Sequence, residues 1–136
     1  MKKFLSLSLA LLMLLSLAAC GSAGLSEEYD EAEVLARAKE LVLLINTLDY
    51  EAVCGQLRED LSGAISPEEL ENAWGESLEK AGAFVEFKSA AAASQESKST
   101  GENYAVAVLV CKYENASLTY TIFMDVDLNI VGMYMK

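Results

Sequence analysis

The stretch Tyr104-Ala105-Val106-Ala107-Val108-Leu109-Val110-Cys111-Lys112-Tyr113 determines the fold more clearly than any other part of the chain. Its alternating positions form two apolar sets, which are Tyr104, Val106, Val108 and Val110 on one face and Ala105, Ala107, Leu109 and Cys111 on the other. Valine and tyrosine favour strands, and a strand with two apolar faces is typical of a sheet that is covered on both sides. We therefore expect a central strand here, buried on both faces.

Three further strands are expected around this central one. After a short turn, apolar and polar residues alternate over residues 117–125, which predicts a strand with one face in solvent. A second turn, residues 125–129, leads into a last strand over residues 130–135. Before the central strand, residues 84–92 alternate in the same way, and the polar run 94–102 connects them to it as a hairpin. The sequence thus predicts a four-stranded antiparallel sheet.

Apolar residues at three- and four-residue steps predict helices before this sheet. The first stripe consists of Val34, Leu35, Ala38, Leu41, Val42, Ile45 and Leu48, and a short second helix is expected over residues 50–57. The third helix has the clearest start, because Ser66 can cap it, Pro67 suits its first position and Glu69 completes a capping box. Its inner stripe consists of Leu70, Ala73, Trp74, Ser77, Leu78 and Ala81, and Gly82 ends it. Three helices followed by four strands indicate the α+β class.

The N terminus has a positively charged start, an apolar run of 16 residues and then Leu17-Ala18-Ala19-Cys20. The run is shorter than the roughly 20 residues that span a bilayer, so a cleaved leader fits better than a membrane helix. The pattern resembles the lipobox of bacterial lipoproteins, which implies a lipid on the Cys20 thiol and cleavage before it. We expect a signal peptide at residues 1–19, the lipidated Cys20 with a short tether at residues 20–28, and one domain at residues 29–136. The domain is expected on the extracytoplasmic side of the membrane.

The charge of the mature chain limits its partners. Loss of residues 1–19 would leave 117 residues, enough for one domain, with 8 basic and 21 acidic residues and a net charge of −13. An acidic surface of this kind repels nucleic acid and anionic lipid headgroups. We therefore exclude nucleic acid as a partner and expect contact with the membrane through the lipid on Cys20.

The sequence contains no histidine. Histidine is the commonest general base near neutral pH and the commonest zinc ligand, so neither a Ser-His-Asp mechanism nor a Cys/His metal site can be assembled. We expect no catalytic residue, no metal and no cofactor. Residues 125–129 begin like a calcium loop, but Ile130 and Lys136 replace the glycine and the glutamate that such a loop needs. A turn is the better interpretation.

Cys54 and Cys111 remain once Cys20 is lipidated. In an exported protein they could form one disulfide. The alternative, which we favour, is that both are small buried apolar residues.

Four aromatic residues could line a pocket between the helices and the sheet: Trp74, Phe87, Tyr104 and Tyr120. The simpler interpretation is that these rings fill the space and form the core. The alanine run 90–93 keeps the pocket hypothesis open, because small side chains leave room for a ligand.

Several segments, in this order, resemble the bacterial domain of unknown function 3887. They include Asn46-Thr47-Leu48-Asp49-Tyr50-Glu51-Ala52-Val53, Ile65-Ser66-Pro67-Glu68-Glu69-Leu70, Trp74, residues 82–84, residues 111–118, residues 123–125 and Ile130-Val131-Gly132-Met133-Tyr134. The resemblance covers about residues 30–135. It implies a cone-shaped α+β roll of the nuclear-transport-factor-two-like or cystatin-like kind, with three helices packed on a curved sheet. It carries no catalytic residues to this chain.

These observations favour a lipid-anchored protein of the cell envelope with a non-catalytic domain that binds a ligand or a protein. Two alternatives remain. The first is a small envelope enzyme with a pocket lined by carboxylates or tyrosines, and the second is an accessory structural module of a membrane complex.

Overall fold

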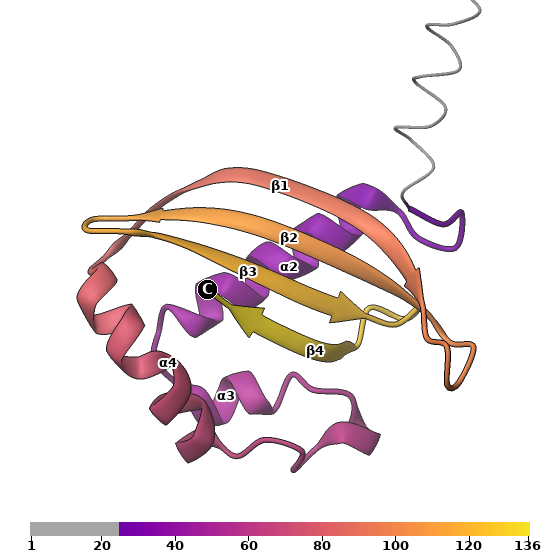
Figure 1. The fold of residues 1–136 in the computed structure, drawn as a ribbon, viewed down its shortest axis with the longest axis horizontal. Coiled ribbons are helices and arrows are strands. Elements are labelled where there is room, and N and C mark those ends of the chain that lie inside the picture. The colour runs from indigo at the N-terminus through magenta and orange to yellow at the C-terminus, as the bar shows by residue number, and fades with distance from the viewer. Residues whose placement is uncertain (1–24) are drawn as a thin grey trace, which may run out of the picture.

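The computed structural model describes residues 25–136, so the predicted leader and Cys20 lie outside the described residues. The elements are α2 (Glu31–Ile45), α3 (Tyr50–Cys54), the 3-10 helix η1 (Glu59–Leu61), α4 (Pro67–Ala81), β1 (Phe84–Glu96), β2 (Asn103–Tyr113), β3 (Ser117–Met124) and β4 (Ile130–Met135). The strands pair antiparallel in the order β1-β2-β3-β4 (Figure 1). The predicted α+β arrangement, with helices before a four-stranded sheet, is confirmed. None of the described helices is both long and apolar enough to cross a membrane.

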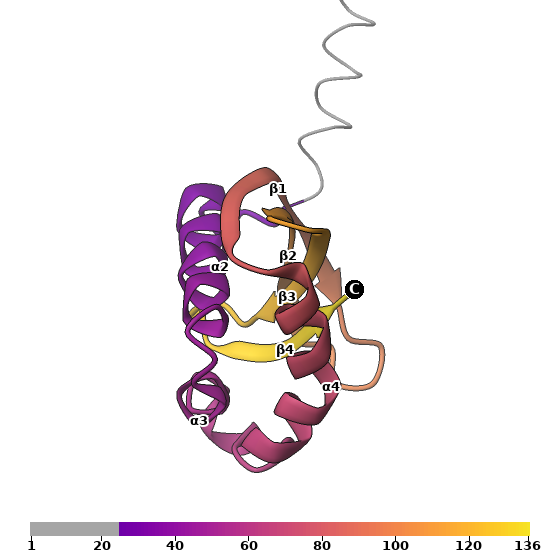
Figure 2. The same ribbon diagram turned by 90° about the vertical axis from the view of Figure 1, so that its left-hand side faces the viewer.

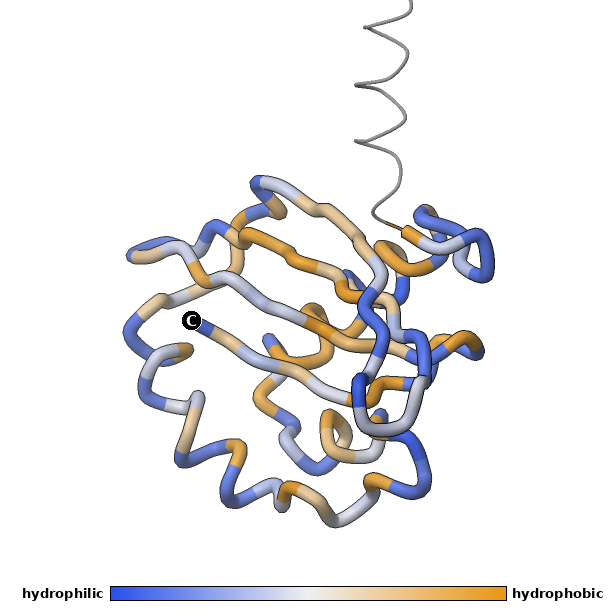
Figure 3. The backbone as a smooth tube through the Cα atoms, turned by 45° about the vertical axis from the view of Figure 1, so that its right-hand side comes forward, coloured by the Kyte–Doolittle hydropathy of each residue, from blue (hydrophilic) through white to orange (hydrophobic). Residues whose placement is uncertain are grey.

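The core lies on one face of the sheet, which we call the inner face. α2 runs along this face, and α3 and α4 lie at the end of the molecule below the sheet in Figures 1 and 2. In the two central strands the buried residues alternate strictly: Ala105, Ala107, Leu109, Cys111 and Tyr113 in β2 and Leu118, Tyr120, Ile122 and Met124 in β3. In Figure 3 the hydrophobic colour follows β2, whereas the β1–β2 hairpin is hydrophilic.

The helices α2, α3 and α4 leave the opposite, outer face of the sheet uncovered, which corrects the expected burial of residues 104–113 on both faces. Val108 is 38% exposed, and Val106 and Val110 are only partly buried. The physical reason lies in the connections. All four strands are joined by hairpin turns, and the helices precede the sheet, so no crossover returns to cover the second face.

The α4 boundaries follow from local chemistry. The Ser66 hydroxyl accepts a hydrogen bond from the Glu69 backbone N–H at 3.1 Å, Pro67 is the first helical residue, and Gly82 ends the helix with φ +81°. The buried stripe is narrower than predicted, because Ala73 and Ser77 are exposed. The helix contacts the core through one row of residues spaced four apart, together with Ala81. This row consists of Leu70, Trp74 and Leu78.

The end of α2 also differs from the prediction. The helix begins at Glu31, where Asp30 caps it, and ends at Ile45. Leu48 is therefore not part of the apolar stripe. It is 54% exposed and has φ +62°, because the chain reverses direction there before α3.

The first described residues are fixed to the hairpin end of the sheet. The Ser26 backbone N–H donates to the Ser94 hydroxyl in β1. The Tyr29 hydroxyl donates to the Asn103 carbonyl at 2.6 Å, and the Asn103 amide donates to Glu28 at 3.3 Å. The chain therefore enters the domain beside the β1–β2 hairpin.

Candidate functional site

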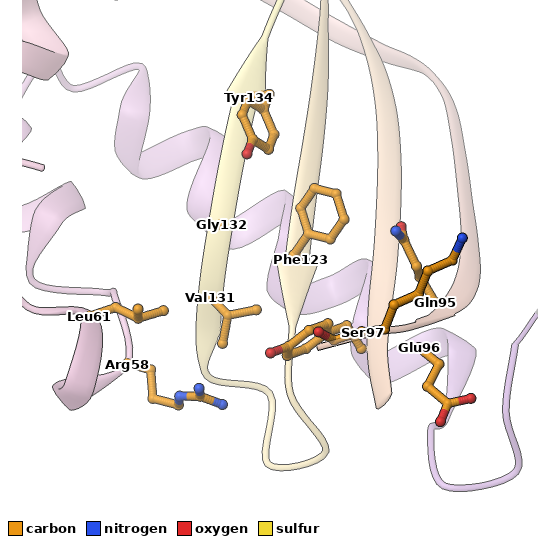
Figure 4. Close-up of a pocket in the computed structure, with 11 residues that line it drawn as sticks. Arg58, Leu61, Gln95, Glu96, Ser97, Phe123, Val131, Gly132 and Tyr134 are labelled. Carbon is orange, nitrogen blue, oxygen red and sulfur yellow. The ribbon is translucent and has the colours of Figure 1, made fainter. Parts of the chain in front are cut away.

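A pocket of about 540 Å³ opens on the outer face of the sheet near the β1–β2 hairpin. All four strands and the segment after α3 contribute to it, as Figure 4 shows. Its lining residues are Arg58, Leu61, Gln95, Glu96, Ser97, Lys98, Tyr104, Phe123, Val131, Gly132 and Tyr134. We call this hollow the outer pocket. Its volume lies within the range of small-molecule sites in proteins.

An aromatic pair from neighbouring strands forms part of the outer pocket. The rings of Phe123 and Tyr134 have centroids 5.8 Å apart and are nearly perpendicular, at 84°. Gly132 faces Phe123 across the β3–β4 pair, and a Cβ atom on this glycine would lie only 3.4 Å from the Phe123 ring. Tyr134 is 65% exposed, which is unusual for a large ring. The alternation in residues 117–125 could have revealed Phe123, because it places this ring with threonines on the solvent face.

A cluster of charged side chains borders the same pocket. The Arg58 guanidinium donates to Asp60 at 2.7 Å, to Glu102 and to Asp125 at 3.3 Å. The backbone N–H of Arg58 donates to the Ile130 carbonyl at 2.7 Å. Arg58 thus ties the segment after α3 to the β1–β2 hairpin and to the β3–β4 turn.

Every carboxyl group that contacts Arg58 has a lowered pKa. Hydrogen bonds from Arg58 lower the pKa of Asp60. The pKa of Glu102 is lowered by hydrogen bonds from Arg58, which have the larger effect, and from Tyr104. For Asp125, burial alone would raise the pKa, but hydrogen bonds from Asn129, Arg58 and the Asp127 backbone outweigh it. All three carboxylates are therefore charged at neutral pH.

Residues 125–129 form the predicted turn. The Asp125 carboxylate accepts hydrogen bonds from the backbone N–H groups of Asp127 at 3.0 Å and Asn129 at 2.9 Å. Within residues 25–136 no three cysteine, aspartate or glutamate side chains are grouped so that they could hold a metal ion.

The structure separates the four residues that were considered as the lining of one pocket. Trp74 and Tyr120 lie together in the core, with ring centroids 6.3 Å apart in an edge-to-face arrangement. Phe87 packs against Phe84 at the margin of the core. Tyr104 lies on the outer face and lines the outer pocket. Alternation along β2 and β3 explains the split, because Tyr104 and Tyr120 have opposite positions relative to the sheet.

Two buried phenols form a hydrogen-bonded chain inside the core. The hydroxyls of Tyr113 and Tyr120 are 2.7 Å apart, and the Tyr113 hydroxyl donates to the Asn46 side-chain oxygen at 2.5 Å. Burial raises the pKa of both tyrosines above the ordinary value. Both phenols are therefore neutral and have a structural role in joining α2 to the sheet.

Cys54 and Cys111 are free thiols and do not form the disulfide considered above. Cys111 lies on the inner face of β2, where burial raises its pKa to about 11. The pKa of Cys54 is raised by burial and then by Glu69. Both thiols are protonated at neutral pH, which makes them poor nucleophiles.

Comparisons with known proteins give two matches. The family model described as "Protein of unknown function (DUF3887)" matches residues 38–133. An NMR structure of a protein from Ruminococcus gnavus ATCC 29149 is similar with a TM-score of 0.74 and 28% sequence identity, over 83% of this chain and 96% of that chain. No curated protein matches the chain.

Proposed function

The chain belongs to the DUF3887 family, whose function is unknown, and we propose that it is a lipid-anchored protein of the bacterial cell envelope that binds a ligand without transforming it. The observation that carries this proposal is the outer pocket with its aromatic pair, in which Tyr134 is exposed and Phe123 is half-buried. A large ring in water is unfavourable for an isolated domain, so the exposed Tyr134 beside a hollow of this size favours a binding site. The proposed anchor rests on the predicted signal peptide and lipobox at residues 1–20.

The electrostatics of the pocket favour binding over catalysis. Acid/base catalysis needs two groups whose pKa values are pushed apart, so that one is protonated near neutral pH. Three carboxylates converge beside the outer pocket, but they converge on Arg58, and the pKa of each is lowered. The pKa of Tyr104, the pocket tyrosine in contact with this cluster, is raised by its hydrogen bond to Glu102. These groups are therefore suited to holding one side of a binding site in place, and not to transferring a proton.

The anchor has a direct test. We expect Cys20→Ser to abolish lipidation and to move the full-length protein from the membrane fraction to the soluble fraction, because serine has no thiol to accept the lipid. Fractionation with an antibody against the domain measures this, and Cys54→Ser is the matched control that should remain in the membrane. A Cys20→Ser protein that stays in the membrane fraction contradicts the anchor.

The pocket has a separate test. We expect that, in a panel of small cationic, neutral and anionic compounds, one class raises the melting temperature of full-length protein in detergent. The fluorescence of Trp74, the single tryptophan, reports unfolding because this ring is buried in the core. Tyr134→Ala should remove the shift, and Val108→Ala, on the same face outside the pocket, should keep it. If no class gives a shift that Tyr134→Ala removes, the outer pocket is not a binding site.

A further inference from the structure

We propose that the outer pocket takes an organic cation, with an alkylammonium group held against the rings of Phe123 and Tyr134. This inference rests on the proposed function, because it names the ligand class of the same pocket. Three observations support it: the geometry of the rings, the balance of charge around them and the engagement of Arg58.

The rings give a cation a place to lie. Aromatic faces carry a partial negative charge that attracts ammonium groups, and alkylated ammonium groups lose little hydration when they bind there. Phe123 and Tyr134 are nearly perpendicular, so they form a corner and not a flat wall. A cation in this corner can contact the face of one ring while its alkyl groups pack against the other. Figure 4 shows the two rings side by side on the strands that form the pocket.

The charge around the pocket favours a cation. Six charged side chains lie at the pocket or contact Arg58: Arg58 and Lys98 are basic, and Asp60, Glu96, Glu102 and Asp125 are acidic. Their sum is −2, on a chain whose net charge is −11. A field of this sign concentrates cations near the surface and repels anions.

The arginine is not available to an anion. An anion site requires donors that are free to contact the ligand, as in bidentate pairs between arginine and phosphate. Here the Arg58 Nε and both terminal nitrogens already donate to carboxylates. Lys98 lies in the exposed hairpin, and it is the remaining cationic side chain of the lining. The pocket therefore lacks the donor set that phosphate or carboxylate ligands need.

The volume leaves room for more than an ammonium group. A hollow of about 540 Å³ is larger than a trimethylammonium head, so the ligand's remaining atoms can extend along the sheet. The shared chemistry could come from a free amine or from a lipid headgroup. The experiment below separates these two sources.

Choline is the probe, and 3,3-dimethylbutan-1-ol is its neutral isostere, in which carbon replaces the charged nitrogen. Full-length protein is studied in phosphatidylglycerol nanodiscs, whose headgroups carry no ammonium group. We expect a dissociation constant of about 1 mM for choline and a rise in Tm of roughly 3–6 °C at ten times that concentration. Potassium chloride at the same ionic strength and the isostere should each shift Tm by less than one third as much.

Variants place the effect in the pocket. Phe123→Leu and Tyr134→Ala should each weaken choline binding by at least about fivefold, as expected for loss of a cation–ring contact of this size. Val108→Ala should bind as the native protein does. In phosphatidylcholine nanodiscs, a raised Tm with no further response to choline identifies the headgroup as the source, and an unchanged response identifies a free amine.

Three results overturn the inference. If the isostere binds as tightly as choline, the pocket selects apolar shape and not charge, while the proposed binding function stands. If neither compound binds but another member of the panel gives a shift that Tyr134→Ala removes, the ligand is of another class. If no compound binds in the pocket, both the inference and the proposed function fail.

Discussion

Leu109→Ala is expected to lower the free energy of unfolding by about 2–5 kcal/mol, whereas Val108→Ala should lower it by less than about 1 kcal/mol. The two residues are neighbours in β2 and have opposite positions relative to the sheet. Leu109 is fully buried against the helices, so its truncation leaves a cavity. Val108 is 38% exposed on the outer face, so its truncation removes methyl groups that already contact water and leaves no enclosed cavity.

Urea unfolding followed by Trp74 fluorescence measures both changes on the same protein. Equal m-values in the three proteins would show that the comparison concerns stability and not the compactness of the unfolded state. A Val108→Ala effect as large as that of Leu109→Ala would mean that the outer face is covered in solution. That result contradicts the uncovered face described here.

Arg58→Ala is expected to destabilise the domain by about 1–3 kcal/mol at pH 7. The Asp125 side chain is only 8% exposed and would lose its counter-ion, although its hydrogen bonds from the β3–β4 turn would remain. This loss of stability is smaller than that caused by breaking a fully buried ion pair, because the Arg58 side chain is 23% exposed. Chemical unfolding at pH 7 measures the loss.

The same substitution should have an effect that depends on pH. The folded-state pKa values of Asp60, Glu102 and Asp125 are lowered, so their stabilisation is present above the unfolded values of about 4 and is lost as pH falls through the folded values. The difference between native and variant proteins should therefore shrink between pH 5 and strongly acidic conditions.

The exposed pair Lys80–Glu76 is the matched control for this prediction. Both side chains are more than 70% exposed, so Lys80→Ala should change stability little at any pH. A difference between the native and Arg58→Ala proteins that persists unchanged at low pH would contradict the role given to the three carboxylates.

The parts of the fold that could be predicted depend on local chemistry. The start of α4 follows from Ser66 and Pro67, and its end from Gly82, because capping acts within one turn of helix. β4 was predicted over residues 130–135, as the structure has it, because the Asx turn before it limits its start. β1 extends to Glu96, beyond the predicted end at residue 92, since an edge strand tolerates polar residues.

The candidate site could not be predicted, because it depends on contacts between distant parts of the chain. Arg58 is 44 residues from Glu102 and 67 from Asp125, and nothing near Arg58 in sequence indicates these partners. Tyr104 was considered together with Tyr120 as the lining of one pocket, because periodicity separates two faces without saying which one is covered. The covered face is set by the topology, because the strands follow one another as a meander and no crossover places a helix on the second face.

The position where the chain enters the domain has a consequence for affinity. Ser26 and Tyr29 are fixed beside the hairpin that borders the outer pocket, and the five steps from Cys20 to Leu25 span at most about 17 Å. With a lipid on Cys20, the pocket would stay within a short distance of the bilayer surface. Any ligand carried on that surface would then be met at a local concentration in the millimolar range. A pocket with low affinity would then bind its ligand at the membrane surface but not away from it. The fraction of occupied pockets would therefore depend on the distance of the domain from the membrane.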